Sequence, residues 1–298
     1  MRATFAAAIL LGAGVCRGQA PASTVVGQVR DASGASVAGA ALALKHVDTN
    51  ETRRAVTGSD GEFTIPDLAP GAYELTAEKE GFERLHQTGL VLAVDQIARL
   101  DLALKVGSVT QTVEVTAETP LLNTENASKG DVIVTEEIAE MPLEGRDFQD
   151  LAFLVPGVAR KPQGGSGSNM AINGARADNT NFTIDGFNDQ NPRGGGAQAR
   201  PPVHTMQEFK MQTSGYSAET GRVAGGVMNM VLKSGGNRVH GDIFEFIRNE
   251  LFDARNFFAI ERPKLRRNQF GATLSGPVWI PRIYNGRNRT FFLFGWES

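Results

Sequence analysis

The sequence predicts a mainly β protein that is exported, and three observations lead to this prediction. A short apolar segment follows Arg2 near the N-terminus. Between residues 24 and 105, short apolar runs recur about every ten residues, with turn-forming residues between them. From His240 to the C-terminus, apolar and polar residues alternate with the period of two that a strand imposes on its two faces.

The N-terminus has the pattern of a signal peptide. Residues 5–15 form an apolar stretch of the length expected for a signal-peptide core. A membrane-spanning helix needs about 20 apolar residues, so this stretch is too short for one. Small residues allow cleavage after Ala20 or Ala22. We therefore expect residues 1–22 to be removed on export.

Cysteine usage and charge exclude several classes of site. Cys16 is the only cysteine, and it lies within the expected signal peptide. The mature chain would then have no thiol for a disulfide, a zinc site or a cysteine nucleophile. A lipoprotein signal is disfavoured because Val15, just before Cys16, is bulky. With 30 basic and 33 acidic residues, the composition gives no reason to expect a nucleic-acid partner.

The first domain has the rhythm of a small β-sandwich. We expect strands at residues 25–29, 40–47, 53–57, 62–65, 73–77, 90–94 and 98–104. The third and fourth of these are expected to pair as a hairpin across Asp60-Gly61, because both residues tolerate the positive φ that a tight hairpin turn requires.

Three runs in this domain resemble the carboxypeptidase-regulatory-like family. They are residues 25–31 (VVGQVRD), 61–75 (GEFTIPDLAPGAYEL) and 81–82 (GF). The resemblance implies an immunoglobulin-like β-sandwich over residues 23–105. It implies no peptidase site, because a zinc carboxypeptidase needs a His-x-x-Glu pair. None of the four histidines has Glu three residues later; they are His46, His86, His204 and His240. We expect no metal and no cofactor.

Residues 106–117 form a linker whose alternating β-branched residues favour an extended strand. On pattern alone, this strand is a last strand of the sandwich, a spacer, or a peptide that joins the sheet edge of another protein.

Short helices and turns follow the linker. Thr135 can cap one turn, and Asp147 can cap a helix over residues 148–155. The glycine-rich residues 164–168 complete neither a phosphate loop nor a nucleophile elbow, so we expect a flexible loop. Asp185-Gly186 is expected to form a turn rather than a calcium site, since the acids of an EF-hand loop are missing.

Four further runs resemble the plug domain of TonB-dependent outer-membrane receptors. They are residues 170–176 (MAINGAR), 181–189 (NFTIDGFND), 206–213 (MQEFKMQT) and 225–235 (GGVMNMVLKSG). Residues 143–148, 253–258 and 266–271 fit the Oar-like subgroup, which carries the same regulatory-like sandwich before the plug. The resemblance implies an α+β plug domain over residues 118–235.

The resemblance also implies a role for the linker. In this family a short β-strand peptide before the plug, the TonB box, is held by a TonB-type energy transducer. The matching residues here are Gln111, Thr112, Val113, Glu114, Val115, Thr116 and Ala117.

The C-terminal residues 236–298 alternate as strands of a membrane β-barrel do. Polar or small residues at 269, 271, 273 and 275 alternate with the apolar Phe270, Ala272 and Leu274. Phe244 and Phe246 share a face, as do Phe292, Phe294 and Trp296. A soluble sheet with one buried face has the same alternation. The plug-like segment upstream favours the barrel.

The connections between these strands predict their orientation. Residues 250–267 form a long connection, expected to be extracellular, whereas the turn around residues 281–289 is shorter and expected to be periplasmic. The long connection carries a basic cluster that could contact outer-membrane lipid: Arg262, Lys264, Arg266 and Arg267. Three or four strands cannot close a barrel, so we expect a fragment of a longer receptor with a truncated transmembrane β-barrel.

The functional prediction is energy-coupled transport of a large ligand across the outer membrane, with the N-terminal domain in the periplasm. Siderophore, glycan, peptide and protein ligands all remain open, and we expect no enzyme activity. The alternative is a cell-surface adhesion or carbohydrate-binding protein that uses the β-sandwich. Further alternating strands encoded after Ser298 would favour transport, and a second sandwich would favour adhesion.

Overall fold

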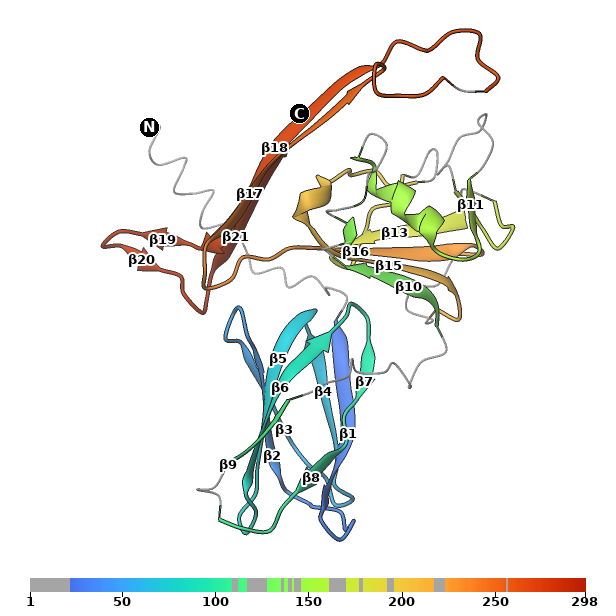
Figure 1. Cartoon of the computed structure of the whole chain (residues 1–298). Helices are drawn as coiled ribbons and strands as arrows, with labels where there is room; N and C mark the ends of the chain where they lie inside the picture. The colour runs from blue at the N-terminus through green and yellow to red at the C-terminus, as the bar shows by residue number, and fades with distance from the viewer. Residues whose placement is uncertain are drawn as a thin grey trace, which may run out of the picture.

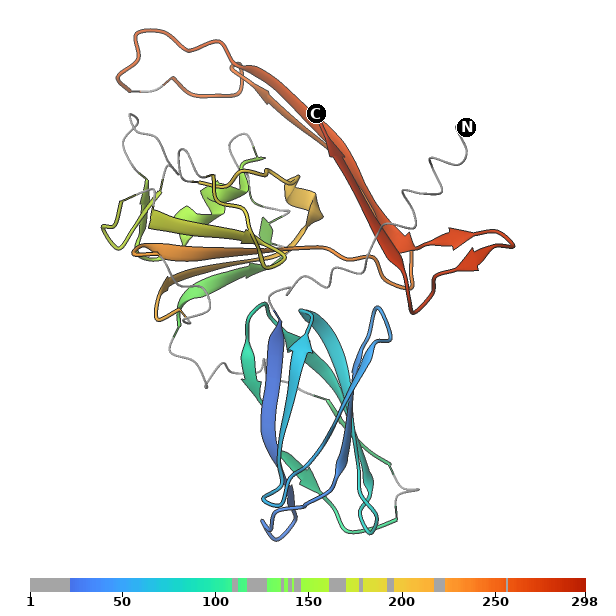
Figure 2. The same ribbon diagram turned by 180° about the vertical axis from the view of Figure 1, so that it is seen from behind.

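A computed structural model describes the chain over residues 22–108, 112–116, 128–134, 137–138, 141, 146–160, 170–176, 179–191, 196–216, 223–255 and 257–298. Residues 1–21 of the predicted signal peptide, the cap at Thr135 and the glycine-rich residues 164–168 lie outside these ranges. Figures 1 and 2, seen from opposite sides, show a sandwich, a mixed α/β layer beside it, and a long antiparallel sheet that stands next to that layer.

The N-terminal domain is a β-sandwich, as predicted. One sheet has the order β4-β1-β7, and β8 also pairs with β1. Its strands are β1 (Ser23–Asp31), β4 (Glu62–Leu68), β7 (Ile97–Arg99) and β8 (Leu102–Leu104). The other sheet has the order β3-β2-β5-β6-β9. Its strands are β2 (Ala41–His46), β3 (Thr52–Val56), β5 (Gly71–Glu78), β6 (Arg84–Leu92) and β9 (Thr112–Thr116).

Inward-facing aliphatic residues of both sheets form the sandwich core, with Leu44, Leu75 and Ile65 almost completely buried. Gly27 on β1 lies against the connection between β7 and β8, at Leu100. A Cβ built there would lie 1.9 Å from the backbone oxygen of Leu100. Only glycine fits this position without moving the chain, because no side-chain atom can approach a backbone oxygen so closely.

The predicted hairpin of residues 53–57 with 62–65 is wrong. The turn is present, with Gly61 at a φ of 73° and a hydrogen bond from Gly58 N–H to Glu62 O. However, β3 pairs with β2, and β4 pairs with β1 in the opposite sheet. The side chains explain this: β4 buries Phe63 and Ile65, while β3 has no fully buried residue and lies at a sheet edge. The turn therefore moves the chain from one sheet to the other.

The predicted last strands also differ in detail. The strand expected at residues 90–94 begins earlier, at Arg84, and the one expected at 98–104 is split into β7 and β8. Both halves run parallel to β1.

The second domain is built on a mixed sheet with the order β10-β15-β16-β13-β14. Its strands are β10 (Lys129–Val134), β13 (Thr180–Ile184), β14 (Phe187–Asn188), β15 (Met206–Ser214) and β16 (Gly226–Leu232). A separate hairpin joins β11 (Val158–Arg160) to β12 (Met170–Ile172), and two short 3-10 helices are η2 (Phe148–Leu154) and η4 (Val203–Thr205). Asp185 and Gly186, with φ of 49° and 80°, form the predicted turn between β13 and β14.

Helix η2 confirms the predicted cap. Asp147 Oδ1 accepts a hydrogen bond from the Gln149 N–H at 3.0 Å, and Phe148, Leu151 and Ala152 are buried. The helix spans Phe148–Leu154 and is of the 3-10 type, so its turn is tighter than that of an α-helix. Among the described residues, no helix is both long enough and apolar enough to cross a membrane.

The C-terminal sheet has the order β17-β18-β21 and is antiparallel throughout. Its strands are β17 (His240–Asn249), β18 (Arg266–Pro277) and β21 (Phe291–Glu297), and a small hairpin, β19 (Trp279–Ile280) with β20 (Tyr284–Asn285), lies between the last two. We call these three strands the wall. It is an open sheet, as predicted.

The two faces of the wall differ. Gly271 and Phe244 are paired, and a Cβ on Gly271 would touch the Phe244 ring, so both lie on one face. The ring of His204 in the plug-like domain stacks on Phe244, so this face is turned toward that domain. The opposite face carries apolar side chains that are exposed: Ile243, Ile247, Phe270, Leu274, Phe294 and Trp296. This confirms the predicted alternation and places Phe244 and Phe246 on the inner face.

The long connection after β17 is closed at its neck by Glu250. Its N–H donates to Leu265 O at 2.8 Å, and its backbone oxygen accepts from Arg262 Nη1 at 2.9 Å. Its carboxylate lies 3.5 Å from Arg266 Nε. Two members of the predicted basic cluster therefore serve to close this loop.

The sandwich core predicts a contrast between two neighbouring residues of β6. Leu90 is 2% exposed and Val91 is 59% exposed. We expect Leu90→Ala to lower the free energy of unfolding by about 2–5 kcal/mol, because it leaves a cavity. Val91→Ala should change it by no more than about 0.5 kcal/mol. Urea unfolding of the two variants measures both values, and equal losses would contradict this burial.

Candidate functional site

The box-like segment lies at the edge of the sandwich. Strand β9 pairs with β6 in parallel, with Val113 opposite Leu85 and Glu114 opposite His86. It ends the sheet order, so among the described residues β9 has a strand neighbour on one side only (Figure 1).

Of the seven predicted box residues, the structure describes five as strand β9: Thr112, Val113, Glu114, Val115 and Thr116. Gln111 and Ala117 lie outside the described residues. Val113 packs against the sandwich core, and Val115 is 39% exposed. The segment is therefore extended, as predicted, and its position is that of a last sandwich strand. Its functional role stays a prediction.

Strand β15 joins the plug-like domain to the sandwich through one of its faces. Phe209 and Met211 are completely buried in the domain core. The alternate residues Glu208, Lys210 and Gln212 point to the other face, and they too are at least 93% buried. Buried polar groups need partners to offset the loss of water, and here the sandwich provides them.

The partners come from the loop between β6 and β7. Val94 N–H donates to Glu208 Oε2 at 2.6 Å. Lys210 Nζ donates to Asp95 O at 2.7 Å and lies 3.3 Å from both Val94 O and Asp95 Oδ2. Gln212 Nε2 donates to Asp95 Oδ2 at 2.9 Å. We call these five residues the clasp.

The loop that carries the clasp is itself fixed to the sandwich. Ser23 Oγ donates to Ala93 O at 2.5 Å, and Ala93 N–H donates to Gln96 Oε1 at 2.8 Å. Asp95 adopts a φ of 51°, which turns its carboxylate and its carbonyl toward β15. The contact is thus held rigidly from both sides.

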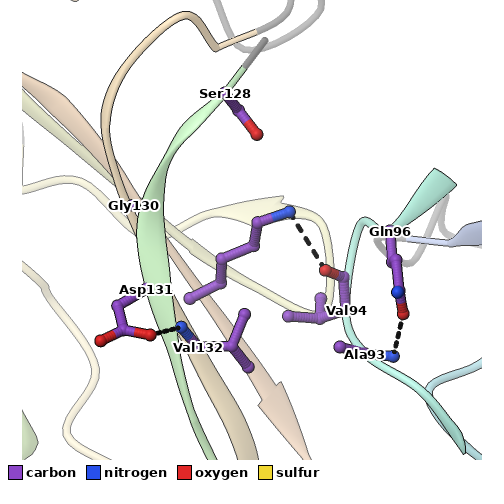
Figure 3. Close-up of a pocket in the computed structure, with 8 residues that line it drawn as sticks. Ala93, Val94, Gln96, Ser128, Gly130, Asp131 and Val132 are labelled. Atoms are coloured by element: carbon purple, nitrogen blue, oxygen red, sulfur yellow. Dashed lines mark hydrogen bonds between the residues drawn. The ribbon is translucent and has the colours of Figure 1, made fainter. Parts of the chain in front are cut away.

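A cleft of about 220 Å³ opens beside the clasp. Figure 3 shows Ala93, Val94 and Gln96 on the sandwich side and Ser128, Gly130, Asp131 and Val132 on the other. Lys210 reaches across it to the Val94 oxygen. Because this lysine is already paired, we assign the cleft no ligand.

Burial raises the pKa of Glu208, while the Val94 N–H and Lys210 lower it. Burial is the largest cause, so the charged carboxylate costs free energy in the folded chain.

A second contact joins the plug-like domain to the wall through Arg146. This residue has a φ of 52°, and its side chain is 3% exposed. Its guanidinium lies 4.1 Å from the Phe246 ring centroid and 3.8 Å, at Nε, from Glu297 Oε1. Its Nε and Nη2 atoms have no hydrogen-bond partner. Burial lowers the pKa of Arg146, and Glu297 opposes this.

His204 and Thr205 of η4 extend this contact. The His204 ring stacks on Phe244 with centroids 3.9 Å apart. A Cβ on Gly295 would lie 2.2 Å from Thr205 Cγ2, so a larger residue there would require the Thr205 side chain to move. Burial, helped by Arg146 and Lys233, lowers the pKa of His204 to about 4, although Asp242 opposes the shift. The ring is therefore neutral at pH 7 and packs as an aromatic group.

The sandwich also contacts the segment that enters the wall. Asn237 N–H donates to Asp48 O at 2.9 Å, and Asn50 Nδ2 donates to Asn288 Oδ1 at 2.9 Å. Asn237 and Asn288 are joined by two hydrogen bonds of 2.7 Å. The sandwich, the plug-like domain and the wall are therefore in mutual contact.

Neither the clasp nor the Arg146 contact was predicted from the sequence. The alternation of Glu208, Lys210 and Gln212 with apolar residues is visible in the sequence. Nothing in the sequence indicates that these residues bind Val94 and Asp95. Arg146 lay within a run already matched to the Oar-like subgroup. Within the described ranges, no group of three or more His, Cys, Asp or Glu side chains could hold a metal ion.

Three family models match the chain in sequence. The carboxypeptidase regulatory-like domain matches residues 24–105, the TonB-dependent receptor plug domain residues 123–227, and an outer-membrane β-barrel domain residues 231–298. The three matches follow one another along the chain in the order predicted from the sequence.

The chain belongs to the family of TonB-dependent outer-membrane receptors. The second domain is therefore the plug, the wall is the start of the barrel domain, and the family locates the chain in the outer membrane. The plug and barrel matches do not favour the alternative of an adhesion or carbohydrate-binding protein.

A curated relative supports the assignment over almost the whole chain. The TonB-dependent transporter Oar of Myxococcus xanthus is 27% identical over 296 residues, which cover 93% of this chain and 27% of the relative. The chain thus spans about a quarter of that protein's length.

Solved structures are only distantly similar. The siderophore receptor PirA of Acinetobacter baumannii has 23% identity and a TM-score of 0.39, covering 50% of this chain and 22% of that one. Hydroxyquinol 1,2-dioxygenase of Pseudomonas putida has 13% identity and a TM-score of 0.25, covering 30% and 57%. Likenesses this weak add nothing to the assignment.

The clasp predicts that the stability of the folded chain depends on pH. The folded-state pKa of Glu208 lies above its usual 4.5, so the folded chain holds a proton that the unfolded chain has released. Stability should therefore fall as the pH rises from about 4.5 through the raised value. Glu208→Gln keeps an oxygen for the Val94 N–H and should remove the part of the change in unfolding free energy with pH that Glu208 causes. Urea unfolding between pH 4.5 and 8 measures it, with the exposed Glu62→Gln as control. Equal slopes in Glu208→Gln and the unsubstituted chain would contradict the assignment.

The plug–wall contact predicts the effect of Arg146→Met. The variant loses the cation–π contact and leaves Glu297 without its cation, a loss of about 1–2 kcal/mol. Amide exchange of Phe244 and Phe246 should then become about five- to thirtyfold faster. Arg200→Met removes a more exposed ion pair, to Asp147, and should leave these amides unchanged. Unchanged exchange in Arg146→Met would contradict a contact that holds the wall.

Proposed function

We propose that this chain forms part of a receptor that transports a large ligand across the outer membrane with energy from a TonB-type transducer. One observation carries the proposal: the plug is seated on the inner face of the wall through the buried Arg146, with Phe246 and Glu297 around it. A plug held on the inner face of barrel strands would occlude the pore of a completed barrel.

The wall suits a lipid boundary on its other face. Ile243 is 92% exposed there, and Phe294 and Trp296 are each about half exposed. Apolar side chains facing outward with mixed side chains inward are the arrangement of outer-membrane strands. The sandwich, which precedes the plug, would lie in the periplasm.

Energy would enter through residues 111–117. A peptide of this kind binds by pairing its backbone with the edge of a partner's sheet, which makes little demand on side chains. Strand β9 is already extended, and it has one strand neighbour among the described residues. The partner would be the C-terminal domain of the transducer.

We infer a receptor rather than an enzyme because the plug and barrel families and the curated relative are those of receptors and transporters.

The box assignment predicts the effect of a proline at Val113. Val113→Pro removes the backbone N–H and fixes φ, so it should weaken binding of the purified transducer C-terminal domain at least about tenfold, or ~1.4 kcal/mol. Val113→Thr keeps the N–H and the side-chain shape and should bind within about threefold of the unsubstituted chain. Calorimetry with the full chain measures both. Equal binding by the proline variant would remove residues 111–117 as the site.

A further inference from the structure

The two edges of the β3-β2-β5-β6-β9 sheet differ in their protection. Natural sheets discourage further pairing at an edge with charges, prolines or bulges. Edge strand β3 carries two adjacent arginines, Arg53 and Arg54. Edge strand β9 reads TVEVT, with Glu114 as its one charge and no proline. Its pairing with β6 is regular over five residues. Among the described residues, no strand pairs with the outer edge of β9, so this edge could accept another strand.

Strand β9 is fixed by its other side. Val113 packs against the sandwich core, opposite the buried Leu85. Thr112 and Glu114 point away from the core and are exposed. A partner strand could therefore pair with the outer edge of β9 without disturbing the contact of Val113.

We propose that the transducer strand adds to the outer edge of β9 while β9 stays paired with β6, so that the sandwich sheet gains a sixth strand. This rests on the proposed function of residues 111–117 as the box. Addition is favoured over release because β9 is already extended, and a pre-ordered strand has less conformational freedom to lose on binding. Release would break the ladder with β6 and expose Val113.

Strand addition at β9 would determine the path by which force from the transducer reaches the plug. A transducer that holds β9 in this way also holds β6, and β6 leads directly into the loop that carries Val94 and Asp95. That loop is bonded to Glu208, Lys210 and Gln212 of β15, the plug strand between β10 and β16. The sandwich would therefore transmit force to β15, an internal strand of the plug sheet, in addition to any force carried by the chain itself beyond β9.

A disulfide between β6 and β9 tests the proposal. His86 and Glu114 are register partners on the face away from the core, and neighbouring strands lie about 4.8 Å apart, within the range that a disulfide spans. The full chain carries His86→Cys and Glu114→Cys, with Cys16→Ser to remove the native thiol. Binding of the purified transducer C-terminal domain is measured on the oxidised chain and again after reduction.

The proposal predicts that oxidised and reduced chains bind within about twofold of each other. Binding that is more than tenfold weaker when oxidised, and restored on reduction, would overturn it, because the transducer would then have to displace β6. Failure of the disulfide to form would also overturn it, since β9 would not be held on β6.

If neither the oxidised nor the reduced double-cysteine chain binds the transducer domain, two controls identify the cause. Glu114→Cys alone shows whether the substitution itself removes binding, in which case Gln87→Cys with Val115→Cys replaces the pair. A free peptide of residues 106–120 separates the remaining cases. If the peptide binds and the chain does not, the sandwich masks the strand and the proposal is overturned. If neither binds, the proposed function of residues 111–117 fails, and this proposal fails with it.

Discussion

The two-sided character of β15 is the constraint on which the rest of the structure depends. Its odd-numbered residues Phe209 and Met211 fill the plug core. The polar residues Glu208, Lys210 and Gln212 alternate with them and are nevertheless buried, and this is stable only because the sandwich loop supplies their hydrogen bonds. Separating the two domains would leave a carboxylate, an ammonium and an amide without these partners. The sandwich is thus built into the plug rather than attached by a linker alone.

The plug has a second buried cation at its other boundary. Arg146 sits between the plug and the wall with aromatic rings beside it and a carboxylate at 3.8 Å. Two guanidinium nitrogens lack hydrogen-bond partners, so this contact is less fully satisfied than the clasp. A buried charge with unmet hydrogen bonds is costly, which makes the wall contact the weaker of the two. Under the proposed function, a plug that moves would separate more readily from the wall than from the sandwich.

Strands, turns and caps could be predicted from neighbouring residues, whereas contacts between residues far apart in the sequence could not. The cap of Asp147 and the alternation around Phe270 follow from neighbouring residues, and both are confirmed. The hairpin across Asp60-Gly61 was wrong because a tight turn does not decide which sheet receives the next strand. The clasp could not be predicted: Glu208 and Val94 are 114 positions apart. Polar residues that alternate along a strand are ordinarily a solvated face.

The exchange rate of one amide tests most directly whether the sandwich and the plug form one body. Val94 N–H donates to the buried Glu208 carboxylate and lies at the centre of the clasp. We expect this amide to be strongly protected in the full chain, and we expect Lys210→Met to remove the protection while Leu75 in the sandwich core stays protected. Rapid exchange at Val94 in the unsubstituted chain would contradict it, because the loop would then be open to water and the two domains would be independent.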